Sequence, residues 1–454
     1  MRNRWIGKRF PVRGHLTQTQ FIASGFGVLI LIGALLLMLP VSSRAGAYGN
    51  LPDCLFTAVS ASCVTGLVVC DTWTHWSLFG QLVILGLIQI GGLGFVTIGV
   101  FLSIVLRRKI GLKERGLMQE SVNTLQIGGV VKLAKKIVLG TAVFEGAGAV
   151  ILALRFIPEL GFWRGMYYGV FHAVSAFCNA GFDLMGYQEE FVSLVDYCDD
   201  WMVNLTIMVL IIIGGLGFIV WDDLSRSGFR WRRYRLHTKL VLISTALLIF
   251  GGALLFYLVE KDNLLRGMSA GGQVLIALFG SVTARTAGFN TVDTAAMTEA
   301  GKLLTVILMF VGGSPGSTAG GVKTTTVLVL YLCMRSTIER ANGVPVFGRR
   351  LEDDALKRAC AIVMINLTLV LAAALFIMAS QQFAMADVFF ETFSAIGTVG
   401  MTTGITRSLS PASRVVIMFL MYCGRVGSLS FALSFTQHKK ITPVQQPAES
   451  IIIG

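Results

Sequence analysis

Long hydrophobic runs alternate along this chain with shorter amphipathic stretches. Eight runs are long enough for a helix to cross a hydrocarbon core of about 30 Å, and they lie at roughly 21–40, 80–106, 137–157, 202–220, 237–260, 301–332, 357–380 and 412–435. Four intervening stretches have room for about three helical turns but not for a span: 52–62, 165–177, 271–283 and 386–396. The pattern predicts an all-α polytopic membrane protein with eight transmembrane helices and four re-entrant pore loops.

Each short stretch ends in a small polar turn with one glycine, and the four turns align with one another. The turn glycines are Gly66, Gly181, Gly288 and Gly400. A bulky apolar residue stands ten positions before each of them: Phe56, Phe171, Leu278 and Phe390. We therefore expect four covalently linked repeats, each of an outer helix (M1), a pore loop and an inner helix (M2), in pseudo-four-fold symmetry around one pore.

These repeats divide the chain into membrane segments and connections. The repeats are 21–109, 137–222, 237–335 and 357–436, and the third contains an intramembrane loop at 312–321. The N-terminus (1–20), the C-terminal tail (437–454) and three connections are expected in the cytoplasm: 110–136, 223–236 and 336–356.

The composition agrees with this scheme. Hydrophobic residues make up 54% of the chain and charged residues only 14%, with a mean hydropathy of +0.72, which excludes an ordinary soluble domain. The net charge of +13 is concentrated in the N-terminus and in every second connection. That distribution predicts a multi-pass protein of the cell inner membrane with both termini cytoplasmic, and it argues against nucleic-acid binding.

Acidic residues gather on the opposite, outward face, where they would concentrate cations: Asp53, Asp71, Asp183, Glu189, Glu190, Asp196, Asp199 and Asp200. The first hydrophobic run resembles a signal peptide, but it is too long for one, and its removal would leave the first repeat without an outer helix. We expect it to be retained. The eight cysteines show no metal-binding spacing, and a Cys54–Cys70 disulfide is a minor alternative to free thiols.

The turns suit the passage of an alkali cation. Rings of backbone carbonyls replace a hydration shell without a fixed charge that would trap the ion, and one glycine per turn frees the backbone to aim them. The C-terminal ends of four pore helices would favour a cation at the same point. We expect K⁺ to be coordinated by the backbone carbonyls of a selectivity filter: Val64, Thr65, Gly66, Asn179, Ala180, Gly181, Thr286, Ala287, Gly288, Thr398, Val399 and Gly400.

The third inner segment cannot remain a continuous helix. Five glycines and a proline interrupt it: Gly312, Gly313, Ser314, Pro315, Gly316, Ser317, Thr318, Ala319, Gly320 and Gly321. With Lys323 after it, the segment loosely resembles a phosphate-binding loop, but the spacing is wrong and no strand precedes it, so we reject nucleotide binding. A loop at membrane depth, facing the permeation path, is expected instead.

Two arginines lie near this path. Arg425 falls where the other copies have glycine, and an arginine near mid-membrane costs at least about 2.5–3.5 kcal/mol. We interpret Arg425 and the loop as a gate, with an ion pair to Glu145 as the alternative. Arg285 is interpreted as a clamp to Asp183 or Glu391, with tuning of the filter as the alternative. For the paired glycines after turns one and two, we favour close helix packing.

Together, these motifs resemble the Trk/Ktr/HKT superfamily of potassium transporters. The resemblance rests on the loops SASCVTGL, SAFCNAGFDL, ARTAGFN and SAIGTVGMTTG, on the segment GGSPGSTAGGVKT and on GRVG in the last inner helix. It covers essentially the whole chain, which is most similar to the membrane subunits of bacterial Ktr systems. The chain departs from relatives at Cys178, where they often carry Asn, and at Ser428, where Pro is common.

The resemblance implies potassium uptake across the bacterial inner membrane, with or without assistance from Na⁺. It also implies a homodimer with one pore per protomer, standing on a cytosolic ring of nucleotide-binding RCK subunits (KtrA type). That ring would bind ATP and ADP, whereas this chain would bind only K⁺ or Na⁺, besides membrane lipid. The basic connections and the tail ending in Ile451, Ile452, Ile453 and Gly454 are the expected contact surfaces.

Other classes fit the sequence less well. Secondary transporters that couple uptake to Na⁺ usually have inverted repeats, whereas every copy here starts from the same side. An intramembrane enzyme would need a catalytic constellation, and no Ser/His, paired-Asp or HExxH arrangement is present. A voltage-gated channel would carry a regular arginine ladder, which is also missing.

Overall fold

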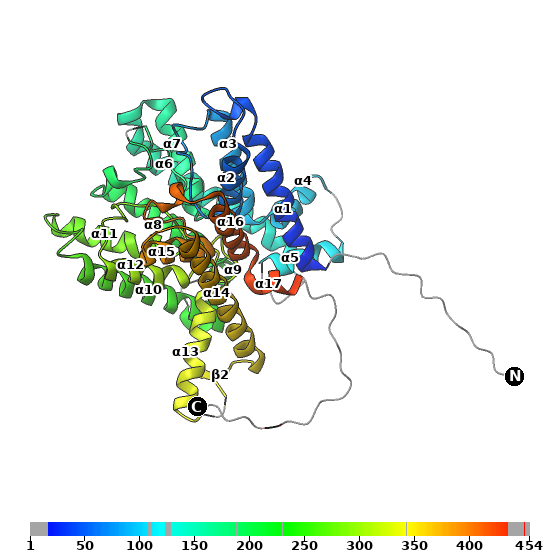
Figure 1. The fold of residues 1–454 in the computed structure, drawn as a ribbon. Helices are drawn as coiled ribbons and strands as arrows, with labels where there is room; N and C mark the ends of the chain where they lie inside the picture. The colour runs from blue at the N-terminus through cyan, green and yellow to red at the C-terminus, as the bar shows by residue number, and fades with distance from the viewer. Residues whose placement is uncertain are drawn as a thin grey trace.

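The computed structural model describes residues 17–107, 111–122, 129–187, 189–228, 230–341, 343–434 and 449. The predicted contact surface at 451–454 and the basic N-terminus before Thr17 lie outside these residues. Within the described part the fold is helical, and the strands there are one short hairpin of β1 (Pro345–Val346) and β2 (Arg349–Arg350). Figure 1 shows the helices packed into one bundle, so the predicted all-α fold is confirmed.

Four long helices form the outer element of each repeat. They are α1 (Gln18–Leu37), α6 (Val130–Leu160), α10 (Leu236–Glu260) and α14 (Asp353–Ser380), and each is long and apolar enough to cross a membrane. The side chain of Thr17 caps α1, which packs against α2 and α3 and buries Phe26, Ile30 and Leu37. It therefore serves as the outer helix of repeat one.

Four shorter helices lie inside this frame. They are α2 (Leu51–Cys63), α7 (Phe162–Phe177), α11 (Ala270–Thr283) and α15 (Met385–Gly397). Their C-terminal halves are buried almost completely, and none is long enough to span a membrane. These re-entrant helices match the predicted stretches to within a few residues, and each ends just before a turn glycine.

The inner segments are broken helices. The pairs are α3 (Leu78–Leu93) with α4 (Phe95–Val105), α8 (Trp201–Leu216) with α9 (Phe218–Ser227), α12 (Glu299–Phe310) with α13 (Thr324–Ile338), and α16 (Pro411–Val426) with α17 (Ser428–Ser434). The first two pairs bend by 93° at Gly94 and Gly217, whose φ angles of +81° and +95° end the preceding helix. The expectation of a single spanning helix is therefore wrong for 80–106 and for 202–220.

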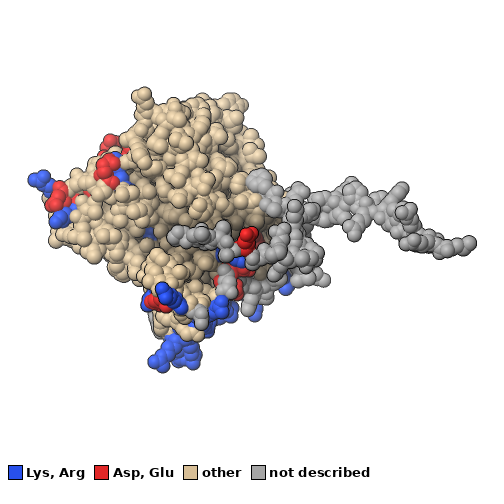
Figure 2. Space-filling model, turned by 60° about the horizontal axis from the view of Figure 1, so that its bottom comes forward, with Lys and Arg blue, Asp and Glu red and all other residues tan. Residues whose placement is uncertain are grey.

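The remaining elements lie in the connections. The helix α5 (Leu112–Val122) and four 3₁₀ turns complete the structure: η1 (Pro40–Ser42), η2 (Val195–Tyr197), η3 (Trp231–Arg233) and η4 (Ile405–Ser408). An ion pair of 2.8 Å joins Lys136 of α6 to Asp222 of α9, and Lys239 lies 5.7 Å from the ring centre of Phe347. The basic connections therefore share one end of the molecule, where Figure 2 shows Lys and Arg side chains below a broad uncharged surface.

The repeats close into a ring. The inner helix of each repeat packs against the re-entrant helix of the next: α3 against α7, α8 against α11, α12 against α15, and α16 against α2. Because the fourth repeat contacts the first, the arrangement is circular, as pseudo-four-fold symmetry requires. The four re-entrant helices therefore surround one axis.

Glycines set how closely the inner and re-entrant helices approach. A Cβ atom on Gly91 of α3 would overlap the carbonyl oxygen of Ser62 in α2. The equivalent glycines of repeats two and four, Gly214 and Gly424, meet the carbonyl oxygens of Phe177 and Ile396 in the same way. Close helix packing, expected for the first two repeats, is thus confirmed, and it extends to the fourth.

This packing predicts that Gly91→Ala destabilises the protein by about 1–3 kcal/mol, the usual cost of overpacking. Gly86 on the same helix is the matched control, since a Cβ there would meet nothing within 4 Å. We expect the Gly91→Ala variant to lower the thermal unfolding midpoint of the detergent-solubilised protein and Gly86→Ala to leave it unchanged or higher. Equal midpoints for the two variants would contradict this description of the packing.

Candidate functional site

The four turns meet in the buried interior, at the axis of the ring. We call residues 64–66, 179–181, 286–288 and 398–400 the axial turns. A Cβ on Gly181 would lie 2.9 Å from the Cα of Gly288, and one on Gly288 would lie 3.2 Å from the Cα of Gly400. The contacts continue from Gly400 to Gly66 (2.9 Å) and from Gly66 to Gly181 (3.2 Å). The glycines therefore form a closed ring with no room for a side chain.

Backbone carbonyl groups fill the space that those side chains would need. At each glycine, the atom nearest to an added Cβ is the carbonyl oxygen of the residue before the next glycine in the ring, and the four oxygens belong to Thr65, Ala180, Ala287 and Val399. Carbonyl oxygens and glycines thus alternate around the axis. A cation on the axis would meet backbone oxygen from all four repeats.

The axial turns share one backbone conformation. All four glycines have positive φ, between +70° and +94°. The residue two positions earlier is also left-handed in every turn, with φ of +57° at Val64, +59° at Asn179, +74° at Thr286 and +51° at Thr398. Left-handed Val and Thr are strained, and such strain is concentrated at functional sites. Sequence reasoning placed these four residues in the filter but did not predict their left-handed conformation, which a β-branched residue does not indicate.

The carbonyl groups of the axial turns are unpaired. Among the described residues, none of the carbonyl groups of these turns accepts a hydrogen bond from a backbone amide. More than about 90% of buried backbone carbonyls in proteins pair with protein groups or with water, so these carbonyls can accept water or coordinate a cation. The re-entrant helices also end here, and their C-terminal partial negative charge favours a cation.

The amides of the turns, in contrast, are held by the re-entrant helices. The amide of Gly66 donates to the Ser60 hydroxyl and that of Gly400 to the Ser394 hydroxyl, both at 3.1 Å. In turns two and three, the amides of Ala180 and Ala287 donate to the carbonyls of Ser175 and Thr283 at 2.8 and 2.9 Å. These bonds fix the amides and leave the carbonyls free for an ion.

The predicted loop at 312–321, which we call the glycine-rich loop, interrupts the third inner segment between α12 and α13. Its base is closed, because the amide of Gly312 donates to the Val322 carbonyl at 2.8 Å. From there the loop crosses to repeat two, where the amide of Ser314 donates to the carbonyl of Gly215 at 3.0 Å. In the opposite direction, the amide of Phe218 in repeat two donates to the Gly316 carbonyl at 2.7 Å.

The glycine-rich loop also contacts two axial turns directly. The hydroxyl of Thr318 donates to the side-chain oxygen of Asn179 at 3.0 Å and to the carbonyl of Phe177 at 3.2 Å. A Cβ on Gly320 would lie 2.8 Å from the methyl carbon of Thr398 in the fourth turn. The loop thus lies against the turns, and Thr318, which the sequence placed in this loop, contacts partners that the sequence did not predict.

Arg425 links the glycine-rich loop to repeat one. Its guanidinium donates to the carbonyl of Thr318 and to those of Gly91 and Gly92, the latter two at 2.5 and 2.8 Å. The alternative partner, Glu145, instead accepts a bond of 3.1 Å from Gln89. The ion pair with Glu145 is therefore absent from the described residues, and Arg425 binds backbone carbonyls from two repeats.

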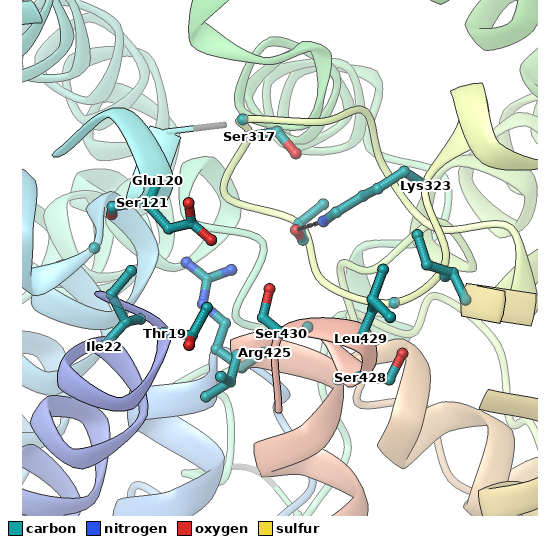
Figure 3. A pocket seen from close by; sticks show the side chains of 18 of the residues that line it. Thr19, Ile22, Glu120, Ser121, Ser317, Lys323, Arg425, Ser428, Leu429 and Ser430 are labelled. Atoms are coloured by element: carbon teal, nitrogen blue, oxygen red, sulfur yellow. Dashed lines mark hydrogen bonds between the residues drawn. The ribbon is translucent and has the colours of Figure 1, made fainter. Parts of the chain in front are cut away.

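A cavity of about 750 Å³ opens on the far side of the loop. Lys323 and Arg425 line it, together with Glu120 of α5, whereas no residue of the axial turns does. The ammonium group of Lys323 donates to the carbonyls of Ala319 and Gly320 at 2.6 and 3.2 Å. In Figure 3 the loop passes above the Arg425 guanidinium, and Lys323 lies on the loop side of the same cavity. The loop and both cations therefore separate the cavity from the turns.

The structure corrects the favoured interpretation of Arg285. This side chain is buried, with 7% exposed, and its Nε has no hydrogen-bond partner among the described residues. Glu391 instead accepts from Thr402 and Thr406. Asp183 accepts from the amide of Met185 at 3.0 Å. The predicted clamp is therefore absent from the described residues. Separately, Cys54 and Cys70 are free thiols.

Comparison with known proteins places this arrangement in a family. Residues 11–442 match the TrkH family, described as a cation transport protein. The chain is 40% identical to the potassium/sodium uptake protein NtpJ of Enterococcus hirae, over 98% of both chains. It is 39% identical to the Ktr system potassium uptake protein B of Bacillus subtilis, over 96% of this chain and 97% of that one.

The fold is similar to the crystal structure of the potassium transporter TrkH from Vibrio parahaemolyticus. The TM-score is 0.70, and the match covers 95% of this chain and 87% of that chain at 20% identity. This likeness supports the fold alone. The family match and the identities to the two relatives, however, extend over nearly the whole chain, so the chain belongs to the TrkH family of cation transport proteins and is a membrane ion transporter rather than an enzyme.

Proposed function

We propose that this protein takes up K⁺ across the bacterial inner membrane through the axial pore. The observation that carries the proposal is the ring of unpaired carbonyl groups, one set from each repeat, around four glycines that admit no side chain. Such a ring replaces the hydration shell of an alkali cation. The relatives at 39–40% identity are named as potassium or potassium/sodium uptake proteins, which agrees with this cargo.

The axial turns act as the selectivity filter in this proposal. Because only one glycine is common to the four turns, the well-defined coordination extends over a short stretch of the axis. Selectivity for K⁺ over Na⁺ is then weaker than in a full potassium-channel filter. Passage of Na⁺, or assistance by it, is compatible with the name of the Enterococcus relative.

The glycine-rich loop, Lys323 and Arg425 act as the gate. They lie between the axial turns and the cavity of about 750 Å³, and the positive charge of Arg425 there repels a cation. The three carbonyl bonds of Arg425 hold the loop in place. Opening requires these bonds to break and the loop to move out of the path.

Regulation would come from a cytosolic partner. The Bacillus relative is named as part of a Ktr system, which supports an assembly of more than one component. We propose a homodimer of this chain on an RCK-type ring that binds ATP or ADP, with both termini in the cytoplasm. The basic connections at one end of the molecule (Figure 2) supply a contact surface for that ring.

The filter assignment predicts that Gly288→Ser lowers the apparent affinity for K⁺, or the preference for K⁺ over Na⁺, by about tenfold, equivalent to about 1.4 kcal/mol. A side chain there would displace the Val399 carbonyl, which lies 2.5 Å from an added Cβ. Gly251→Ser is the matched control, since nothing lies within 4 Å of that position. Uptake of ⁴²K⁺ and ²²Na⁺ into proteoliposomes checks the prediction, and an unaltered K⁺/Na⁺ preference refutes the filter assignment.

The gate assignment predicts that Arg425→Ala raises K⁺ flux several-fold in the absence of any partner, because three bonds to the carbonyls are lost. Deletion of 312–321 is expected to do the same. The residues that flank this deletion, Val311 and Val322, form a β-bridge. They therefore lie close enough for the chain to be rejoined there. Lys357→Ala, which removes a charge from the same cavity, serves as the control. Flux that is unchanged in both gate variants, at equal protein abundance, contradicts the assignment.

The proposed function as a whole is tested in a strain that lacks its own potassium uptake. Expression of this chain should restore growth at low K⁺, and co-expression of a cytosolic RCK subunit should increase the rate of K⁺ uptake. Stimulation by the subunit supports a gated pore with a regulatory ring. If the protein is present in the membrane and K⁺ uptake stays at background with and without the subunit, the proposal fails.

A further inference from the structure

A second cavity lies away from the axis, where repeats one and two meet. Its volume is about 540 Å³, and its walls come from the connection after α1, the connection before α3 and the first turns of α3 and α7. The residues that matter to its chemistry are Arg44, Trp73, Leu78, Gln81, Arg164 and Tyr167. This is the end of the molecule at which the re-entrant helices begin, opposite the basic connections.

Two arginines in this cavity share one aromatic ring. The guanidinium carbon of Arg44 lies 4.1 Å from the ring centre of Trp73, and that of Arg164 lies 4.4 Å from it. Stacking on an indole is favourable for each cation, but it brings two like charges together. Nothing in the repeat architecture requires this arrangement. Lysine and arginine are also less frequent in the outer connections of membrane proteins than in the cytoplasmic ones.

Neither arginine has a carboxylate partner among the described residues. Arg44 donates through Nε to the Trp76 carbonyl at 3.2 Å, and Arg164 donates to the Tyr168 hydroxyl at 3.3 Å. The Nε of Arg164 is buried and has no partner among the described residues. Two guanidinium charges without a carboxylate partner among the described residues therefore line an open cavity.

Three other cations at the same end of the molecule are neutralised by carboxylates. Arg155 binds Asp200 at 2.5 Å, Lys302 binds Asp387 at 3.1 Å and Arg414 binds Asp53 at 2.8 Å. An anion that is not part of the chain would neutralise Arg44 and Arg164 in the same way. Arginine forks match the geometry of phosphate oxygens, with two parallel hydrogen bonds from each guanidinium.

The cavity lies at the level where lipid-facing side chains begin. Leu78 in the first turn of α3 is 61% exposed, and Trp163, next to Arg164, is 83% exposed. Leu82 follows one turn later on α3 and is half exposed. Exposed aromatic residues of this kind mark the boundary between headgroups and hydrocarbon. A ligand with a phosphate at the arginines and acyl chains along α3 fits this boundary.

We propose that Arg44 and Arg164, on either side of Trp73, bind the phosphate group of a membrane phospholipid. The lipid bridges the connection after α1 in repeat one and the start of α7 in repeat two. Its phosphate neutralises the two arginines, and its acyl chains cover the apolar surface that begins at Leu78. The site is independent of the axial turns, so it does not depend on the ion that the pore carries.

The test measures lipid binding to the full-length protein in detergent by native mass spectrometry and by the shift in thermal unfolding midpoint. The probes are phosphatidylglycerol, diacylglycerol, which lacks the phosphate, and inorganic phosphate. We expect phosphatidylglycerol to bind and to raise the midpoint of the wild type. Arg44→Gln and Arg164→Gln should each weaken this binding at least about tenfold, because each removes charge-assisted hydrogen bonds.

Arg266→Gln is the matched control, since Arg266 is an exposed arginine at the same end of the molecule and lies outside the cavity. It should bind phosphatidylglycerol like the wild type. K⁺ flux and the elution profile of each variant show that it is folded. Equal phosphatidylglycerol binding by wild type and both cavity variants overturns the proposal. Equal protection by diacylglycerol overturns the role of the phosphate, and equal protection by inorganic phosphate alone overturns the assignment to a lipid.

Discussion

The close approach of four backbone segments at the axis constrains the rest of this structure. At each glycine of the ring, the space that a Cβ would need is filled by a carbonyl oxygen of the neighbouring turn. Even a methyl group there would push the turns apart. The four re-entrant helices must therefore end at nearly the same depth. The inner helices must approach them closely as well, which explains the glycines at 91, 214 and 424. Conformational strain at Val64, Thr286 and Thr398 persists because this packing holds the turns in place.

Repeats three and four differ from repeats one and two in their inner segments. Repeat three replaces a bent inner helix with the glycine-rich loop, and repeat four replaces a glycine with Arg425. The two changes complement each other, because the arginine donates to Thr318 of the loop and to Gly91 and Gly92. Hydrogen bonds to a charged group contribute about 1.5–3 kcal/mol each, so three of them offset the insertion cost of about 2.5–3.5 kcal/mol. The arginine is stable in the membrane only while these carbonyls are in reach, which couples its position to that of the loop.

Several expectations were wrong for reasons that lie in three dimensions. Hydropathy predicted a continuous helix over 80–106, yet a positive φ at Gly94 bends the segment by 93°. The charge of Arg285 suggested an ion pair with Asp183 or Glu391, but both carboxylates are satisfied by nearer donors. The alternative partner for Arg425, Glu145, was excluded in the same way, because Gln89 donates to that carboxylate. In each case the structure depends on one hydrogen-bond donor or one dihedral angle, and the type of a residue does not indicate either of them.

The sequence by itself determined the helical membrane fold, the four-fold repetition and the position of the axial glycines, because hydropathy and glycine spacing report local requirements of the backbone. It also located the glycine-rich loop, since that composition cannot remain helical. The tertiary structure alone decided which carbonyls meet at the axis, which groups Arg425 binds, and that Arg44 and Arg164 share the ring of Trp73. These contacts join residues from different repeats or distant segments. Their geometry follows from the circular closure of the repeats, which no local pattern in the chain specifies.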